Sequence, residues 1–138
     1  MIDESDPFTG TWKFNTQQSS LDTPLPRTWV QAIVATTDEL VVRETIIRAD
    51  GSATEVRVWA RFDGTDYPLN GLPFVDFIAY QRANRNRISG IGKKNGVVVL
   101  NETVTVDEAG KVLTLIYSIQ NGTSSLATGM AVFDKSPA

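Results

Sequence analysis

Residues 54–64 read TEVRVWARFDG. Apolar side chains at positions 56, 58, 60 and 62 alternate with charged or bulky side chains at 55, 57, 59 and 61. Successive side chains of an extended strand point to opposite faces, so this alternation predicts a strand with one buried face. The Asp63-Gly64 pair is typical of tight hairpin turns, which need residues that tolerate positive φ. The stretch therefore predicts a β-strand that ends in a hairpin.

The same pattern recurs along the chain. Asp-Gly or Asn-Gly pairs stand at 50–51, 63–64, 70–71, 95–96 and 121–122, between runs rich in valine, isoleucine, threonine and aromatic residues. Most links between these runs are short, which requires antiparallel neighbours. We expect strands over 10–15, 29–35, 40–49, 54–62, 74–82, 87–94, 97–106, 111–120 and 126–134, with a short piece at 67–69.

These strands predict an all-β fold, an up-and-down antiparallel barrel of about eight to ten strands. A barrel is favoured over an open sheet because closure removes unpaired strand edges. We expect one domain over residues 1–138. The one long link, residues 16–28, contains Pro24 and Pro26 and is either a lid at one end of the barrel or a corner.

The composition excludes several kinds of chemistry. The chain has no cysteine and no histidine, so disulfides, thiolate chemistry, histidine-bound metals and a Ser-His-Asp triad cannot occur. We expect no cofactor and no metal, and any catalysis would depend on carboxylates, tyrosine, lysine or arginine. The net charge of -3 argues against nucleic acid as a partner. Five cations nevertheless gather in one segment: Arg82, Arg85, Arg87, Lys93 and Lys94.

The sequence also bears on location and assembly. No apolar stretch approaches the roughly 20 residues that span a bilayer. Residues 1–6 are polar and acidic, unlike a signal peptide, so we expect either a cytoplasmic protein or a mature exported form. We expect a monomer or a homodimer.

Three motifs resemble those of a known family. Residues 8–15 read FTGTWKFN with a G-x-W signature, residues 62–71 read FDGTDYPLNG, and residues 131–135 read AVFDK. In this order they resemble the patterns GTWKLN, YDGKDYPV.G and VYDK of small bacterial lipocalin-like proteins, which are similar to lipocalins and fatty-acid-binding proteins. Phe14 and Phe62 depart from the leucine and tyrosine of that pattern. The resemblance implies a calycin-type barrel with a central cavity and with Trp12 closing one end.

Two groups of residues are candidates for binding a ligand. Arg57 and Trp59 share one strand face, as do Glu44 and Ile46 on the neighbouring strand. Arg57 could bind a ligand carboxylate that Glu44 orients, or these charges could form a ladder on the surface. The second group either lines an apolar pocket or fills a closed core. It consists of Trp29, Trp59, Phe77, Tyr117, Met130 and Phe133.

Four residues are candidates for acid–base chemistry: Asp76, Tyr80, Glu102 and Glu44. Asp76 and Tyr80 lie four apart in a predicted strand, so they share a face as either a buried acid–base pair or an ordinary surface pair. Glu102 interrupts an apolar face, which indicates either a carboxyl group with a raised pKa or a residue at the barrel mouth.

The sequence therefore supports two functions. The first is binding of a small apolar or amphipathic molecule inside the barrel. The second is a cofactor-independent isomerase, cyclase or hydrolase that uses carboxylates and tyrosine in the same cavity. A structural module with a filled core is the remaining possibility.

Overall fold

The computed structural model describes residues 6–137, and within this range all regular structure is β-strand. The strands are β1 (Gly10–Phe14), β2 (Ser20–Leu21), β3 (Thr28–Ala35), β4 (Glu39–Ile47), β5 (Ala53–Arg61), β6 (Asp66–Asn70), β7 (Phe77–Asn84), β8 (Arg87–Lys94), β9 (Val97–Val106), β10 (Val112–Asn121) and β11 (Ser124–Lys135). These residues include no helix long and apolar enough to cross a membrane.

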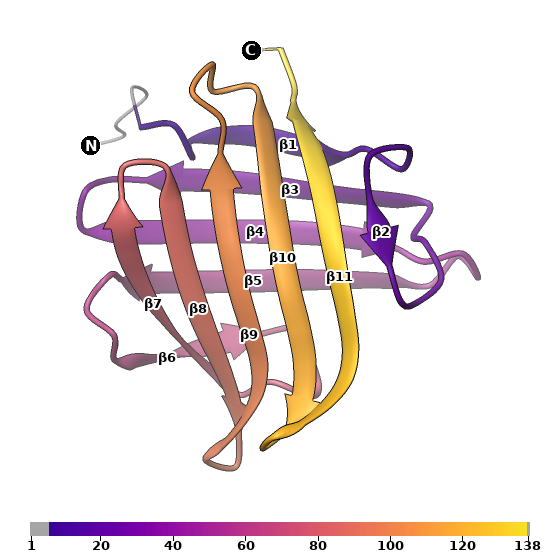
Figure 1. Cartoon of the computed structure of the whole chain (residues 1–138), viewed down its shortest axis with the longest axis vertical. Helices are drawn as coiled ribbons and strands as arrows, with labels where there is room; N and C mark the ends of the chain where they lie inside the picture. The colour runs from indigo at the N-terminus through magenta and orange to yellow at the C-terminus, as the bar shows by residue number, and fades with distance from the viewer. Residues whose placement is uncertain (1–5, 138) are drawn as a thin grey trace.

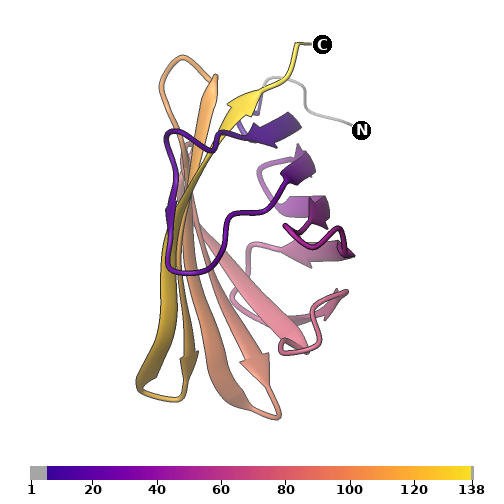
Figure 2. The same cartoon turned by 90° about the vertical axis from the view of Figure 1, so that its right-hand side faces the viewer.

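The strands form a closed antiparallel barrel with up-and-down topology. β1 and β3 to β11 pair in chain order, and β1 also pairs with β11, which closes the ring. β2 lies outside this order and pairs only with β11. β1 and β3–β5 run across β7–β11 in Figure 1, and Figure 2 shows the two sets as facing layers. This orthogonal arrangement is calycin-like, and it confirms the predicted fold class.

The predicted strands, including the short piece at 67–69 within β6, agree with the observed ones within a few residues, β2 was not predicted, and the start of β7 differs most. Residues 74–82 were expected to be extended, but β7 begins at Phe77. A turn precedes it, in which the Val75 amide donates to the Leu72 carbonyl at 3.2 Å. Pro73 favours such a turn because its φ is fixed and it has no amide proton to give to a sheet.

One end of the barrel is plugged by aromatic packing. Trp12 and Phe8 are fully buried, and the Trp12 indole donates to the Phe8 carbonyl oxygen at 3.0 Å. The Lys135 ammonium group lies over the Trp12 ring, 5.6 Å from its centre. Trp12 therefore packs in the wall and end of the barrel, as the sequence resemblance implies.

A buried ion pair reinforces the same end. The Arg82 guanidinium donates to both carboxylate oxygens of Asp6, at 2.7 and 3.1 Å, and to the Thr36 carbonyl oxygen at 2.9 Å. It also stacks over the rings of Phe8 and Phe62, 5.2 and 5.5 Å from their centres. Because Arg82 joins the N-terminal segment to two hairpin turns, access to the interior is left to the opposite end.

Candidate functional site

The interior is hollow between its plugged and open ends. A cavity of about 570 Å³ opens among the loops around residues 23–26, 48–50 and 72–74. Its walls are mainly apolar and include Trp29, Ile46, Val56, Leu100, Leu115 and Ile119. A smaller cavity of about 40 Å³ lies further in, against Phe8, and Glu44 and Glu102 line both cavities. The two glutamates therefore stand where the inner and outer spaces meet.

The long link at 16–28 forms part of the mouth. β2 pins it to β11, and Thr128 donates its backbone amide and its hydroxyl to the Asp22 carboxylate, both at 2.9 Å. Leu21 and residues 23, 24 and 26 line the larger cavity. The link is thus a strap held across one side of the opening.

Four polar side chains line the inner cavity, and we call them the polar layer: Gln31, Glu44, Tyr80 and Glu102. On one wall, Gln31 of β3 lies directly opposite Glu44 of β4. On the facing wall, Tyr80 of β7 lies opposite Gly90 of β8, and Gly90 lies opposite Glu102 of β9. Each wall therefore supplies two members at one level of the barrel.

Glycines make room for this arrangement. A Cβ atom at Gly90 would lie 2.9 Å from a ring carbon of Tyr80 and 3.1 Å from the Glu102 side chain. Along the same row, Glu102 lies opposite Tyr117, and Tyr117 lies opposite Gly129. A Cβ atom at Gly129 would lie 2.5 Å from the Tyr117 hydroxyl oxygen. Glycine in a strand marks such close approach, so these large polar side chains lie against the wall.

Hydrogen bonds orient the two carboxyl groups. The Trp29 indole donates to Glu44 Oε1 at 2.8 Å, and the Tyr80 hydroxyl donates to the Glu102 carboxylate. Both glutamates retain a small exposed fraction because they face the cavity. A carboxylate can accept about four hydrogen bonds, so each keeps acceptor capacity directed at the interior.

The surroundings make these acids weak. Burial, followed by the charge of Glu44, raises the pKa of Glu102 to about 7, although the Tyr80 hydrogen bond opposes the change. Burial also raises the pKa of Glu44, against the Trp29 hydrogen bond, and raises the pKa of Tyr80 well above its usual value. Near neutral pH, Glu102 therefore exists in both protonated and ionised forms, and it can give or take a proton.

Several residues singled out in the sequence meet in this interior. Glu44, Tyr80 and Glu102 belong to the polar layer, while Trp29 and Tyr117 line the larger cavity. Phe133 is also inside, but it is fully buried in the core. Its ring packs edge-on against Trp29 with centres 5.0 Å apart, so it supports the wall behind the cavity.

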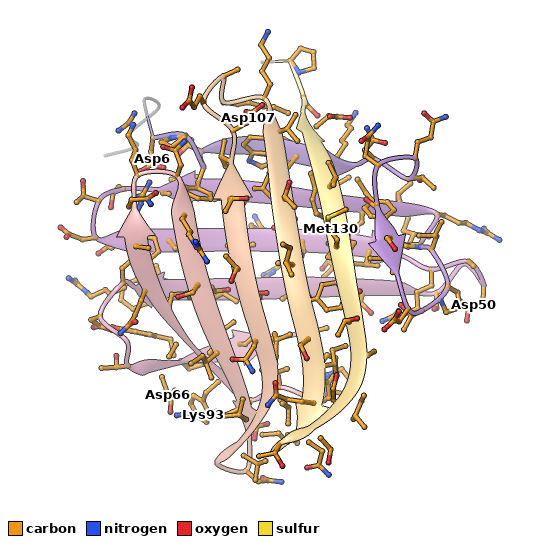
Figure 3. The ribbon with its side chains drawn as sticks, viewed as in Figure 1. Asp6, Asp50, Asp66, Lys93, Asp107 and Met130 are labelled. Atoms are coloured by element: carbon orange, nitrogen blue, oxygen red, sulfur yellow. The ribbon has the colours of Figure 1, made fainter. Side chains whose placement is uncertain are left out.

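Four other candidates lie on the outside of the barrel and do not line the cavity: Arg57, Trp59, Phe77 and Met130. The register explains Arg57 and Trp59, because Glu44 lies opposite Val56 and the next residue of β5 must point outward. Met130 lies on the outer face of β11 (Figure 3). The expected pairing of Arg57 with Glu44 around a ligand is thereby corrected.

Asp76 is also separated from Tyr80. It precedes β7 and receives hydrogen bonds from the Lys94 ammonium group at 3.0 Å and the Asn95 amide at 3.1 Å. The Asn95 amide, then Lys94, lower its pKa, which is unsuited to a general base near neutral pH. The expected Asp76–Tyr80 pair is corrected because the turn at 72–75 delays the start of the strand.

Three of the five cations in the segment that is rich in them, Arg82, Lys93 and Lys94, pair with carboxylates. Arg82 is partly buried at the plugged end, where it pairs with Asp6, and the Lys93 ammonium group lies 3.3 Å from the Asp66 carboxylate on the outer surface (Figure 3). Lys94 pairs with Asp76 at 3.0 Å. These charges are divided between a structural ion pair and local surface contacts.

Sequence reasoning missed Gln31, Gly90 and Gly129. Gln31 stands in a run of alternating β-formers, where one amide is an ordinary strand residue. The glycines did carry a signal, since SGIG at 89–92 and TGM at 128–130 place glycine inside strands that no turn interrupts. Which side chains occupy the space beside these glycines could be predicted only from the strand register.

Fold and cavity together define a calycin-like β-barrel with a hollow, mainly apolar interior that holds two glutamates where its inner and outer spaces meet. A comparison with protein-family models and with curated proteins finds no match for the chain. Within residues 6–137, no group of three or more acidic side chains is placed to hold a metal ion.

Proposed function

We propose that this protein binds a small apolar or amphipathic molecule inside its barrel. The observation that carries the proposal is the cavity of about 570 Å³, which is apolar along its walls and polar at its inner end. Small-molecule sites typically have volumes of about 300–1,000 Å³ with apolar linings and a few convergent polar groups. The three sequence motifs support the same proposal and, with it, a place among small lipocalin-like proteins.

The architecture suits such a ligand. Its apolar part would replace water along the wall formed by Val56, Leu100 and Ile119, gaining about 25 cal/mol for each Å² removed from water. The strap and the loops around 48–50 and 72–74 would surround the outer part of the ligand. Trp29 would lie beside the guest and report binding through its fluorescence.

Competition with a neutral hydrophobic dye, Nile red, tests the proposal. We expect saturable binding to one site, with displacement by amphipathic molecules and a change in Trp29 emission. Two variants of β10 form a matched pair. Ile119→Trp places an indole in the cavity and should weaken dye binding at least about tenfold, whereas Ile116→Trp adds the same ring on the exposed outer face. Equal binding to both variants would show that the dye occupies some other surface.

A second candidate function is acid–base catalysis on a bound substrate by a cofactor-independent isomerase, cyclase or hydrolase. It is favoured by the hydrogen-bonded contact between Tyr80 and Glu102 at the inner end of an open cavity. A carboxyl group with a pKa of about 7 exchanges protons efficiently near neutral pH. Turnover that depends on Glu102 would favour this function, and bound ligands recovered unchanged would favour simple binding.

A further inference from the structure

We propose that the ligand carries a primary amine, and that its ammonium group lies in the polar layer against Glu44, Glu102 and Gln31 while its apolar body fills the larger cavity. The inference rests on the proposed binding function and names the chemical class of the ligand.

The charges at the inner end have one sign. Glu44 from β4 and Glu102 from β9 line both cavities, and their neighbours Tyr80 from β7 and Tyr117 from β10 are neutral phenols. Among the residues that line the two cavities, the only cation is Arg48, at the mouth. An acidic ligand head would therefore meet two carboxyl groups with no counter-charge, whereas a cation would be attracted by both.

The mouth does not supply the missing cation. The Arg48 guanidinium donates to the hydroxyl groups of Ser52 and Thr54, within its own hairpin. It also lies close enough to Asp50 to lower the pKa of that carboxyl group, although the hydrogen bonds from Ser52 contribute more. Arg48 and Asp50 thus offset one another at the rim, and the inner acids keep their preference for a positive partner.

An unused polar side chain points to a ligand independently of the acids. Gln31 is only 6% exposed and lines the inner cavity. Its side-chain amide hydrogen-bonds no group within the described residues 6–137. Because this amide faces the inner cavity, its carbonyl oxygen is available to a donor there. An ammonium group has three donors, and the polar layer offers an acceptor on each of Glu44, Glu102 and Gln31.

The inner cavity limits the size of the head group. Its volume of about 40 Å³ exceeds the 10–15 Å³ or so that a single water requires, so a primary ammonium group fits. A quaternary ammonium group has no N–H donors and carries three methyl groups around the charge, so it would lose both fit and hydrogen bonds. The polar layer should therefore prefer primary amines to quaternary ones.

Binding of an amine should be linked to proton release. Burial and the charge of Glu44 raise the pKa of Glu102 to about 7, and a nearby ammonium group favours the ionised carboxylate. The amine itself is already protonated at this pH. At pH 7 the complex should release up to about half a proton, and affinity should rise between pH 5.5 and 8. A neutral ligand of the same length should show neither effect.

Four ligands that share a chain of ten carbons, the carboxyl carbon of decanoate included, test the proposal: decylamine, decanol, decanoate and decyltrimethylammonium. Affinities are measured by Nile red displacement at pH 8, and proton release by calorimetry at pH 7 in two buffers of different ionisation enthalpy. We expect decylamine to bind at least tenfold more tightly than each of the others. Glu102→Gln and Glu44→Gln should remove most of the preference for decylamine over decanol, measured as the ratio of the two affinities in the same variant. Glu55→Gln, on the exposed face of β5, is the matched control and should retain it.

The outcomes separate the two proposals. Binding of decanol or decanoate without any preference for decylamine overturns the amine inference and leaves the binding function intact. If all four ligands fail to bind, the binding function itself is refuted. If Glu102→Gln weakens the binding of decanol and of decylamine by the same factor, Glu102 has a structural role and does not recognise the amine.

Discussion

Replacement of Glu102 by glutamine is expected to stabilise the folded protein at pH 8, although it alters the centre of the cavity. Glutamine has nearly the shape of glutamate and can still accept the Tyr80 hydroxyl hydrogen bond, but it carries no charge to bury. Native Glu102 instead must ionise where burial and the charge of Glu44 both oppose a negative charge. Ionisation of Glu102 in the polar layer therefore lowers the stability of the folded state.

The magnitude follows from proton linkage. The pKa of Glu102 is about 7 in the folded protein against an ordinary value of 4.5. Because the folded pKa is raised, the native protein loses stability as pH rises between these values and reaches a plateau above them. Each pKa unit between the folded and the ordinary value corresponds to 1.36 kcal/mol, so the loss of stability amounts to about 3 kcal/mol. The Glu102→Gln variant lacks this loss. The free energy of unfolding of the variant should therefore equal that of the native protein at pH 4 and exceed it by at most about 3 kcal/mol at pH 8.

Urea unfolding of both proteins at pH 4, 5, 6, 7 and 8 measures this difference directly, with m-values compared to confirm that the same surface is exposed. Glu39→Gln, which removes an exposed acid from a 3.4 Å surface ion pair with Arg61, should change stability by less than about 1 kcal/mol at every pH. A stability difference for Glu102→Gln that stays constant from pH 5 to pH 8 would refute the reasoning. So would a variant that is less stable than the native protein at pH 8.

Two further substitutions and one control substitution test the frame that holds the cavity. Arg82→Met should destabilise the barrel by about 3–5 kcal/mol in urea unfolding, because it leaves the buried Asp6 carboxylate without its charge partner, and a loss below about 1 kcal/mol would contradict this view of the plug. Gly71→Ala should cost more than about 3 kcal/mol or prevent folding, since φ is +109° and the new Cβ would lie 1.8 Å from the Glu55 carbonyl oxygen. Gly96→Ala, at φ +77° with open space around it, should lose only about 1–2 kcal/mol, and similar thermal shifts for the two glycine variants would count against the packing argument.

Local patterns predicted much of this fold. Alternation in residues 54–62 and the Asp-Gly and Asn-Gly pairs identified the strands and hairpins, because each reflects the geometry of a few neighbouring residues. The same alternation predicted that Glu102 interrupts an apolar face, and the structure places it at the inner cavity. The delayed start of β7 was missed because the turn at Pro73 competes with an apolar run that also fits a strand.

The assignment of side chains to the interior needed more than alternation. Arg57 and Trp59 were expected beside Glu44, yet the β4–β5 register places Val56 opposite Glu44 and directs both of them outward. A shift of one residue between paired strands exchanges the two faces, and no single strand contains that information. The interior role of Gln31 was hidden for the same reason.

Residue types and short-range order were therefore enough to predict a set of antiparallel strands, their turns and the absence of histidine and thiol chemistry. Glu44 and Glu102 are far apart in the chain, and it is the folded barrel that brings them to one cavity with Tyr80 and Gln31. Their meeting depends on closure of the ring, on strand register and on the space left by Gly90 and Gly129. The acidity of these groups follows from that shared burial, because a carboxyl group acquires its pKa from its surroundings.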